Sequence, residues 1–199
     1  MLTDVAINTI YILNQFQPKE IHMKRIYIAY GANTNRRAMA RRCPNAKPIG
    51  AGFIVGQKFK FNNVADIVPA QMGSGVSDAP AVAWEITPHC EKALDRFEGF
   101  PSLYRKIDVT FKITGMQKKW QFDHMQSEYK GFAYKMNYTG FHTPSPMYVD
   151  GIRTGLKGFF NSGYWDMIDN SIDSAIIKSF RMEETGSPLT KRVGGSQWR

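Results

Sequence analysis

The chain has 199 residues, of which 43% are hydrophobic and 22% are charged, and its formal net charge is +9. This length and composition predict one globular domain with a sizeable core. They exclude a chain that spans a membrane with helices, because no apolar run is long enough to cross a bilayer. The two cysteines form no CxxC pair and the four histidines are scattered, so we expect no disulfide framework, no metal site and no cofactor.

Residues 1–23 are expected to form an N-terminal extension that precedes the main domain. The segment opens with apolar residues and has Asp4 but no basic residue near its start, which is atypical of a secretion signal. The sequence therefore predicts a cytoplasmic protein. We expect the extension either to pack on the main domain or to mediate self-association into a homo-oligomer.

A short strand followed at once by a basic helix is predicted next. The apolar and aromatic run 25–30 predicts a strand that Gly31 ends. Asn33, Thr34 and Asn35 can each cap a helix that continues to Pro44. Backbone N–H groups at such a helix start can bind a carboxylate or an oxyanion, and Gly31 lets the backbone approach a ligand closely. The alternative interpretation is a turn that only connects a strand to a helix.

The positive charge is concentrated between residues 21 and 65, where nine lysines and arginines occur without one acidic residue. Such a stretch can attract phosphates or acidic small molecules, or it can be a basic face that only water solvates. The sequence contains no zinc finger, no aromatic RNA-binding motif and no heptads after the basic run. Nucleic-acid binding therefore ranks lowest among the functions that we consider.

Strands and helices follow one another without strict alternation. Strands are expected over six segments, residues 50–62, 64–71, 81–86, 105–114, 119–125 and 129–137. Residues 72–80 have the composition of a loop, 147–160 predict a helix, and 164–180 predict one or two more before a tail rich in Gly and Ser. This order favours an α+β fold with a curved, mostly antiparallel or mixed sheet. We expect the main domain to span 24–160 and a helical C-terminal extension to span 161–199.

The clearest local pattern is the helix predicted between Thr87 and Gly99. Thr87 is a good N-cap, a proline follows it at the first helical position, and Gly99 is a good C-terminal stop. Cys90 and Leu94 lie on the apolar stripe of this helix. The pattern therefore predicts that Cys90 is a buried thiol.

Glu98 is the one carboxylate on this helix whose position suggests chemistry. It lies about 40° around the helix from Leu94, so it borders the apolar stripe, in the last turn, where the helix dipole disfavours a negative charge. Burial and the dipole both raise the pKa of Glu98, which makes it a candidate general base. The alternative is that Glu98 pairs with Arg105 or Lys106, or faces water.

Four signatures stand in a fixed order along the main domain. They are YIAYGAN at 27–33, the Cys-Pro pair at 43–44, LDRFEG at 94–99 with Tyr104 after it, and PSPMY at 144–148 with Ile152 and Gly155 after it. With these signatures the sequence resembles the γ-glutamylcyclotransferase-like family, also called the AIG2-like family. The resemblance implies a small mixed β-barrel flanked by helices.

The resemblance also implies a site for a small-molecule γ-glutamyl substrate. It assigns Glu98 as the catalytic acid/base and implies that the substrate is bound by Tyr30, Gly31, Ala32, Asn33, Tyr104 and Tyr148. The family's usual Ser is Ala32 here, so one hydroxyl donor is missing while the backbone amides of the turn are kept.

The leading hypothesis is an enzyme that cyclises a γ-glutamyl amide to 5-oxoproline and releases an amine or amino acid. Because nucleophile and carbonyl belong to one molecule, this reaction needs neither a cysteine nucleophile nor a metal. The alternative is a non-catalytic small-molecule-binding module on the same fold. The sequence does not identify the leaving amine, since that depends on the distal wall of the pocket.

Overall fold

The computed structural model describes residues 25–70, 78–114, 116, 127–138 and 140–185. Five strands close into a barrel in the order β1-β5-β2-β6-β7. Strands β1 and β7 are parallel, and the other neighbouring pairs are antiparallel. The barrel strands are β1 Arg25–Ala29, β2 Lys47–Ile54, β5 Ala79–Ile86, β6 Tyr104–Ile113 and β7 Glu128–Met136. The predicted α+β fold with a small mixed barrel is therefore confirmed.

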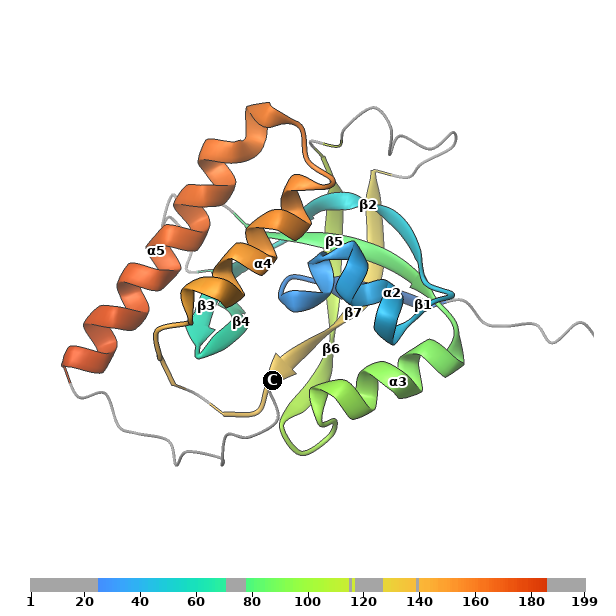
Figure 1. Cartoon of the computed structure of the whole chain (residues 1–199), viewed down its shortest axis with the longest axis horizontal. Helices are drawn as coiled ribbons and strands as arrows, with labels where there is room; N and C mark the ends of the chain where they lie inside the picture. Colours follow the sequence, from blue (N-terminus) through green and yellow to red (C-terminus); the bar gives the residue numbers. More distant parts are fainter. Residues whose placement is uncertain (1–24, 71–77, 115, 117–126, 139, 186–199) are drawn as a thin grey trace, which may run out of the picture.

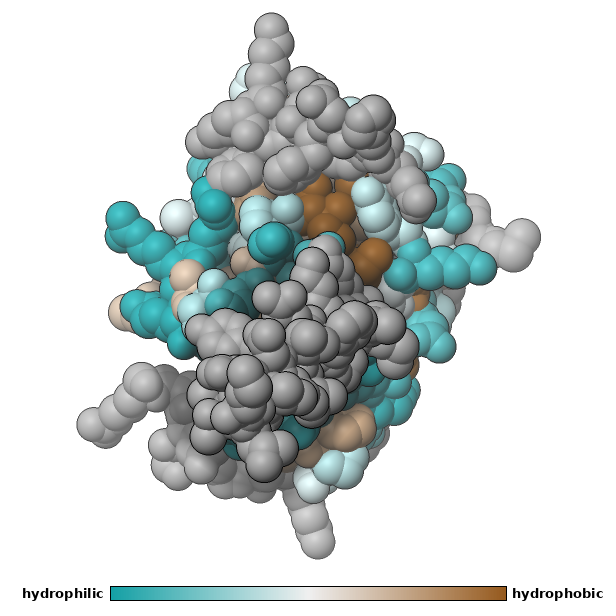
Figure 2. Space-filling view, turned by 90° about the vertical axis from the view of Figure 1, so that its right-hand side faces the viewer, coloured by the Kyte–Doolittle hydropathy of each residue, from teal (hydrophilic) through white to brown (hydrophobic). Residues whose placement is uncertain are grey.

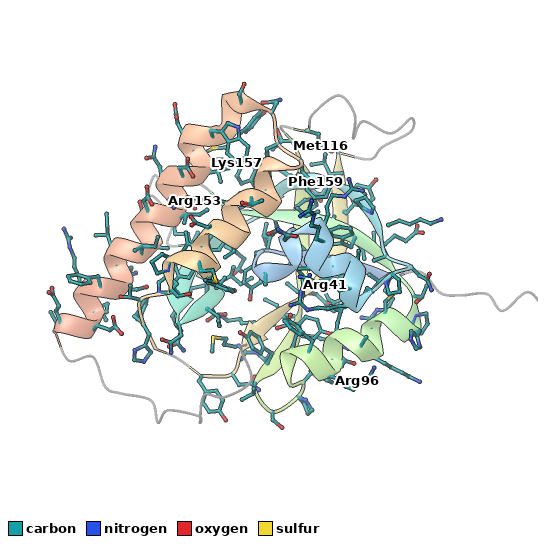
Figure 3. The ribbon with its side chains drawn as sticks, in the orientation of Figure 1. Arg41, Arg96, Met116, Arg153, Lys157 and Phe159 are labelled. Atoms are coloured by element: carbon teal, nitrogen blue, oxygen red, sulfur yellow. The ribbon has the colours of Figure 1, made fainter. Side chains whose placement is uncertain are left out.

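Helices flank the barrel, and α4 and α5 lie side by side (Figure 1). Arg153 on α4 joins the two helices, because it forms ion pairs with Asp169 and Asp173 on α5 (Figure 3). The helical elements are η1 Ala32–Thr34, α2 Arg36–Arg42, α3 Pro88–Glu98, α4 Pro146–Lys157, η3 Ser162–Tyr164 and α5 Trp165–Glu184.

The strand predicted over residues 50–62 is wrong, because this segment forms parts of two strands in different sheets. β2 ends at Ile54, and the chain then turns through Gly56, whose φ of 67° lies in the left-handed region that favours glycine. The strands β3 Gln57–Asn62 and β4 Val64–Pro69 form a separate antiparallel hairpin. The apolar residues on both sides of Gly56 hide this turn from a reading of hydrophobic pattern alone.

The boundaries of the other elements differ less from those predicted from the sequence. α4 ends at Lys157, three residues before the predicted end, and α5 is one continuous helix where one or two were expected. The strand expected over 119–125 and most of the loop expected over 72–80 lie outside the described residues, as does the extension 1–23.

The core is continuous from the barrel to its helices. Cys90 is buried as predicted, and Cys43 is buried beside it, with its thiol donating to the Cys90 carbonyl oxygen at 3.4 Å. On the face shown in Figure 2, hydrophilic residues cover most of the described surface and hydrophobic ones a smaller area. None of the helices in the described ranges combines the length and hydropathy that a transmembrane span requires.

Candidate active site

The turn between β1 and α2 forms one wall of the site. Gly31 follows β1, and residues 32–34 form the short 3-10 helix η1. The side-chain oxygen of Asn35 then caps α2 by accepting hydrogen bonds from the backbone N–H groups of Arg37 and Ala38. These two N–H groups are therefore bonded to Asn35 and are not available to the anion that the sequence analysis expected at the start of this helix. Any backbone N–H group that binds a ligand at this turn must come from the residues before Asn35.

Glu98 reaches the site from the C-terminal end of α3. Thr87 caps the start of α3 by accepting a hydrogen bond from the Cys90 N–H, and Gly99 ends it in the left-handed conformation, as predicted. Leu94 is fully buried one turn before Glu98 and anchors the helix on the barrel. Because α3 ends at Glu98, the carboxylate lies at the edge of the core.

All seven residues singled out from the sequence line one small pocket, with a volume of about 40 Å³. Aromatic rings form much of its wall, and Glu98 is the one carboxyl group among its described lining residues, which include no lysine, arginine or histidine. The lining residues are Tyr27, Tyr30, Gly31, Ala32, Asn33, Val64, Ala65, Phe97, Glu98, Tyr104, Tyr134 and Tyr148. The structure thus brings the turn after β1 and the carboxylate at the end of α3 into the same cavity.

The side chain of Asn33 connects the turn to Glu98. Its amide nitrogen donates to Glu98 Oε1 at 3.1 Å and to the Tyr27 hydroxyl at 3.0 Å. Its amide oxygen accepts a hydrogen bond from Arg42 Nη1 at 2.8 Å. Both hydrogens of this amide are therefore engaged within the protein. That Asn33 binds a substrate stays a prediction; in this structure its amide nitrogen contacts the carboxylate of Glu98.

Burial raises the pKa of Glu98 to about 7, although the positive charge of Arg42 opposes this rise. The direction agrees with the sequence-based expectation. A carboxyl group with this pKa is divided between its acid and carboxylate forms at neutral pH. It can accept a proton in one step and donate it in the next.

Tyr148 covers the backbone of the turn from α4. Its hydroxyl oxygen accepts a hydrogen bond from the Ala65 N–H at 3.1 Å. A second bond from the Ala32 backbone and this one both act to lower the pKa of Tyr148, but burial outweighs them and keeps it above its usual value. The oxygen accepts both of these bonds, so the hydroxyl hydrogen of Tyr148 is not used by either of them.

The other tyrosines of the pocket are neutral. Burial is the first cause of a raised pKa at each of four tyrosines, Tyr27, Tyr30, Tyr104 and Tyr134, and the charge of Glu98 adds to the rise. The Tyr30 hydroxyl donates to the carbonyl oxygen of Tyr134 across the barrel. The Tyr134 hydroxyl donates to Asp95 Oδ1 at 2.6 Å, so the hydroxyl hydrogens of Tyr30 and Tyr134 are used within the protein. These rings add no second charge to the site.

The basic residues that follow α3 do not bond Glu98. Lys106 pairs instead with Glu91 and Asp95, and Arg105 donates to the carbonyl oxygen of Met136. The surface ion pair that the sequence left open as an alternative is therefore absent among the described contacts of Glu98.

Sequence reasoning missed several residues of the pocket region. Tyr27 belongs to the signature at 27–33 and Phe97 to the signature at 94–99, so these two motifs could have indicated both residues. Arg42 stood among other arginines of the basic helix and nothing local distinguished it. Tyr134 is brought in by the pairing of β7 with β1, whose register places Phe132 opposite Tyr27, and no local pattern predicts that contact.

Comparisons with known proteins show the fold. A solved structure named "Gamma-glutamyl cyclotransferase" is 17% identical, with a TM-score of 0.55, and the match covers 87% of this chain and 92% of that one. A crystal structure of an uncharacterized protein from Homo sapiens is 18% identical, with the same TM-score and coverage. No family model matches the chain, and no curated protein matches it in sequence. The resemblance seen in the sequence is thus confirmed at the level of the fold.

Proposed function

We propose that this chain cyclises a γ-glutamyl amide to 5-oxoproline and releases an amine or amino acid, with Glu98 as general acid/base. One observation carries the proposal. The carboxylate of Glu98, whose pKa burial raises to about 7, shares a pocket with the turn after Tyr30. The named structural neighbour is a gamma-glutamyl cyclotransferase, which is consistent with this reaction.

The chemistry requires a group that moves protons near neutral pH. The α-ammonium nitrogen must lose a proton before it can attack the γ-carbonyl carbon, and the Glu98 carboxylate accepts that proton. The new C–N bond closes the five-membered ring, and the bond to the leaving nitrogen breaks as Glu98 returns a proton to it. In all, the ring nitrogen loses two protons and the departing amine gains two, so Glu98 ends in its starting state.

The remaining groups of the pocket orient the substrate. The Tyr148 hydroxyl, held by two backbone amides, donates to a substrate oxygen, and Asn33 fixes the carboxylate that it contacts. Folding the γ-glutamyl chain against the aromatic wall brings the nitrogen close to the carbonyl carbon. Effective molarities of roughly 10⁵–10⁸ M for well-oriented intramolecular reactions explain why the site needs so few groups.

The test is an amine-release assay with a panel of γ-glutamyl compounds, run on the wild type and on Glu98→Gln. Glutamine keeps the shape of the side chain and removes the base, so we expect a fall of at least about 10²-fold. Glu184→Gln on the exposed end of α5 is the matched control, since it makes the same chemical change far along the chain. Equal rates for wild type and Glu98→Gln would overturn the proposal.

The second candidate is a binding module without turnover, and one observation favours it. The Tyr148 hydroxyl already accepts a hydrogen bond from the backbone of Ala32, which belongs to the turn expected to bind a substrate carboxylate, and Ala32 offers no side-chain hydroxyl. Mass spectrometry of the bound compound separates the two candidates. A γ-glutamyl compound that binds and is recovered unchanged supports the module, and recovered 5-oxoproline supports the enzyme.

A further inference from the structure

Arg42 differs from the other arginines of α2. Arg36, Arg37 and Arg41 are exposed, whereas Arg42 at the C-terminal end of the helix is partly buried. Its guanidinium carbon lies 3.6 Å from the centroid of the Phe97 ring, beside Glu98 on α3. Contact with this ring restricts the guanidinium to one position between the two helices.

From that position Arg42 donates through Nη1 to the side-chain oxygen of Asn33 at 2.8 Å. Asn33 itself is buried, and its nitrogen donates to Glu98 Oε1 at 3.1 Å. The three side chains form an unbroken chain of hydrogen bonds from α2 through η1 to the end of α3.

The chemistry of the donors fixes the direction of this chain. A guanidinium group has donors only, so the Asn33 side chain must present its oxygen to Arg42. Its NH₂ group then necessarily faces Glu98 and Tyr27. If the amide were flipped, NH₂ would face the guanidinium and the amide oxygen would face the carboxylate. Arg42 therefore determines that Glu98 receives a hydrogen bond instead of a repulsive contact.

We infer that Arg42 is a positioning residue: through Asn33 it holds the Glu98 carboxylate in its reactive position, and its charge sets the pH range in which that group works. This inference rests on the function proposed above for Glu98. Arg42 contacts two lining residues, Asn33 and Phe97, from behind but does not itself line the pocket. By that account it does not touch the substrate, so it acts through Asn33 and through its field.

Arg42 can influence the pH at which Glu98 titrates, because it is the one charged partner of Glu98 among the described residues. The groups that face Glu98 from β1, β6, β7 and α4 are tyrosines, namely Tyr27, Tyr104, Tyr134 and Tyr148, and the burial that raises their pKa keeps them neutral. Removing the charge of Arg42 therefore leaves the effect of burial unopposed, and the pKa of Glu98 rises above about 7.

The first experiment follows the carboxyl group directly, by ¹³C NMR titration of protein labelled at glutamate, with Glu98→Gln used to assign the resonance. Arg42→Gln keeps an NH₂ donor for Asn33 and removes the charge, so we expect the titration midpoint of Glu98 to rise by roughly one pH unit. Arg42→Lys keeps the charge and should leave the midpoint near that of the wild type. Arg41→Gln, the matched change on the exposed neighbour, should leave it unchanged.

The second experiment measures amine release against pH for the same variants and for Arg42→Met, which removes both the charge and the donor. In Arg42→Gln the rising limb should move to higher pH by the same amount, while the high-pH plateau of kcat is kept. In Arg42→Met the plateau should also fall, by about 10-fold, because the amide of Asn33 is free to turn. A variant that only loosened the fold would lower the plateau without moving the limb.

The outcomes separate this inference from the proposed reaction. A Glu98 midpoint in Arg42→Gln that stays at the wild-type value overturns the inference. If Arg42→Gln does not fold, Arg42→Met, which also removes the charge, gives the same test. A midpoint that moves in a protein with no amine release on any γ-glutamyl compound upholds the role of Arg42 and overturns the reaction alone.

Discussion

Replacing Gly155 with alanine should damage both the fold and the site, because α4 packs on the turn at this residue. A Cβ atom placed on Gly155 would lie 2.5 Å from Thr34 Oγ1, 2.6 Å from the backbone nitrogen of Asn35 and 2.7 Å from the carbonyl carbon of Thr34. Two of these three atoms belong to the backbone, which cannot rotate away as a flexible side chain can. The turn or α4 must therefore move.

The expected size of the effect follows from two opposing contributions. Overpacking in a well-packed region costs about 1–3 kcal/mol, and contacts this short with backbone point to the upper end. The alanine regains about 0.5–1 kcal/mol of helix propensity over glycine. The free energy of unfolding of Gly155→Ala should therefore fall by about 2 kcal/mol. Urea unfolding followed by circular dichroism measures this change.

Gly151 on the same helix provides the matched control. A Cβ atom there would meet nothing within 4 Å, so only the propensity gain applies. Gly151→Ala should be more stable than the wild type by about 0.5–1 kcal/mol. If Gly155→Ala proves as stable as Gly151→Ala, then α4 does not pack on the turn as described.

Three further predictions, one pH profile and two substitutions, test the site. Amine release, measured as kcat/KM, should rise through about pH 7 as Glu98 loses its proton, and a profile that is flat from pH 6 to 8 would contradict its role as base. Glu98→Gln should stabilise the protein at pH 8 by about 1–3 kcal/mol but not at pH 4. Between the usual pKa of glutamate and about 7, the folded carboxyl group binds more protons than the unfolded one, so the stability of the wild type falls as pH rises through that window. Equal urea midpoints for wild type and variant at pH 8 would refute this. Tyr148→Phe should lower stability by about 1–2 kcal/mol, because the Ala65 N–H loses its acceptor, and an unchanged melting temperature would show that the amide finds another partner.

The helix ends and the buried face of α3 could be predicted from the sequence, because both depend on neighbouring residues in the chain. Thr87 and Gly99 specify both ends of α3 through capping chemistry that involves only their own neighbours, and the apolar stripe of the helix placed Cys90 inside and Glu98 at its border. The same holds for Asn35, one of the candidate caps of α2, whose side chain bonds two amides just beyond it. These features follow from the helical repeat and needed no knowledge of the fold.

Contacts between distant elements were beyond any local pattern. The Gly56 turn lies within one apolar run, and only the barrel register shows that β2 and β3 belong to different sheets. The side chains of Arg42 and Arg41 are equivalent in the sequence, and their difference arises because one of them faces Phe97 on α3. The signature residue Gly155 likewise has a physical reason, the close approach of α4 to the turn, that becomes visible only in three dimensions.

The amide of Asn33 lies between Arg42 and Glu98, which explains why the arginine does not hold the pKa of Glu98 low. A guanidinium in direct contact would lower the pKa of a carboxylate by about 1–3 units and keep it ionised, so that it could not hold and return a proton. Here one amide, that of Asn33, separates the two charges. Burial then remains the larger effect, and the opposing charge limits the rise, so that the pKa of Glu98 lies near 7. A carboxyl group balanced in this way can serve as the base in one step and as the acid in the next.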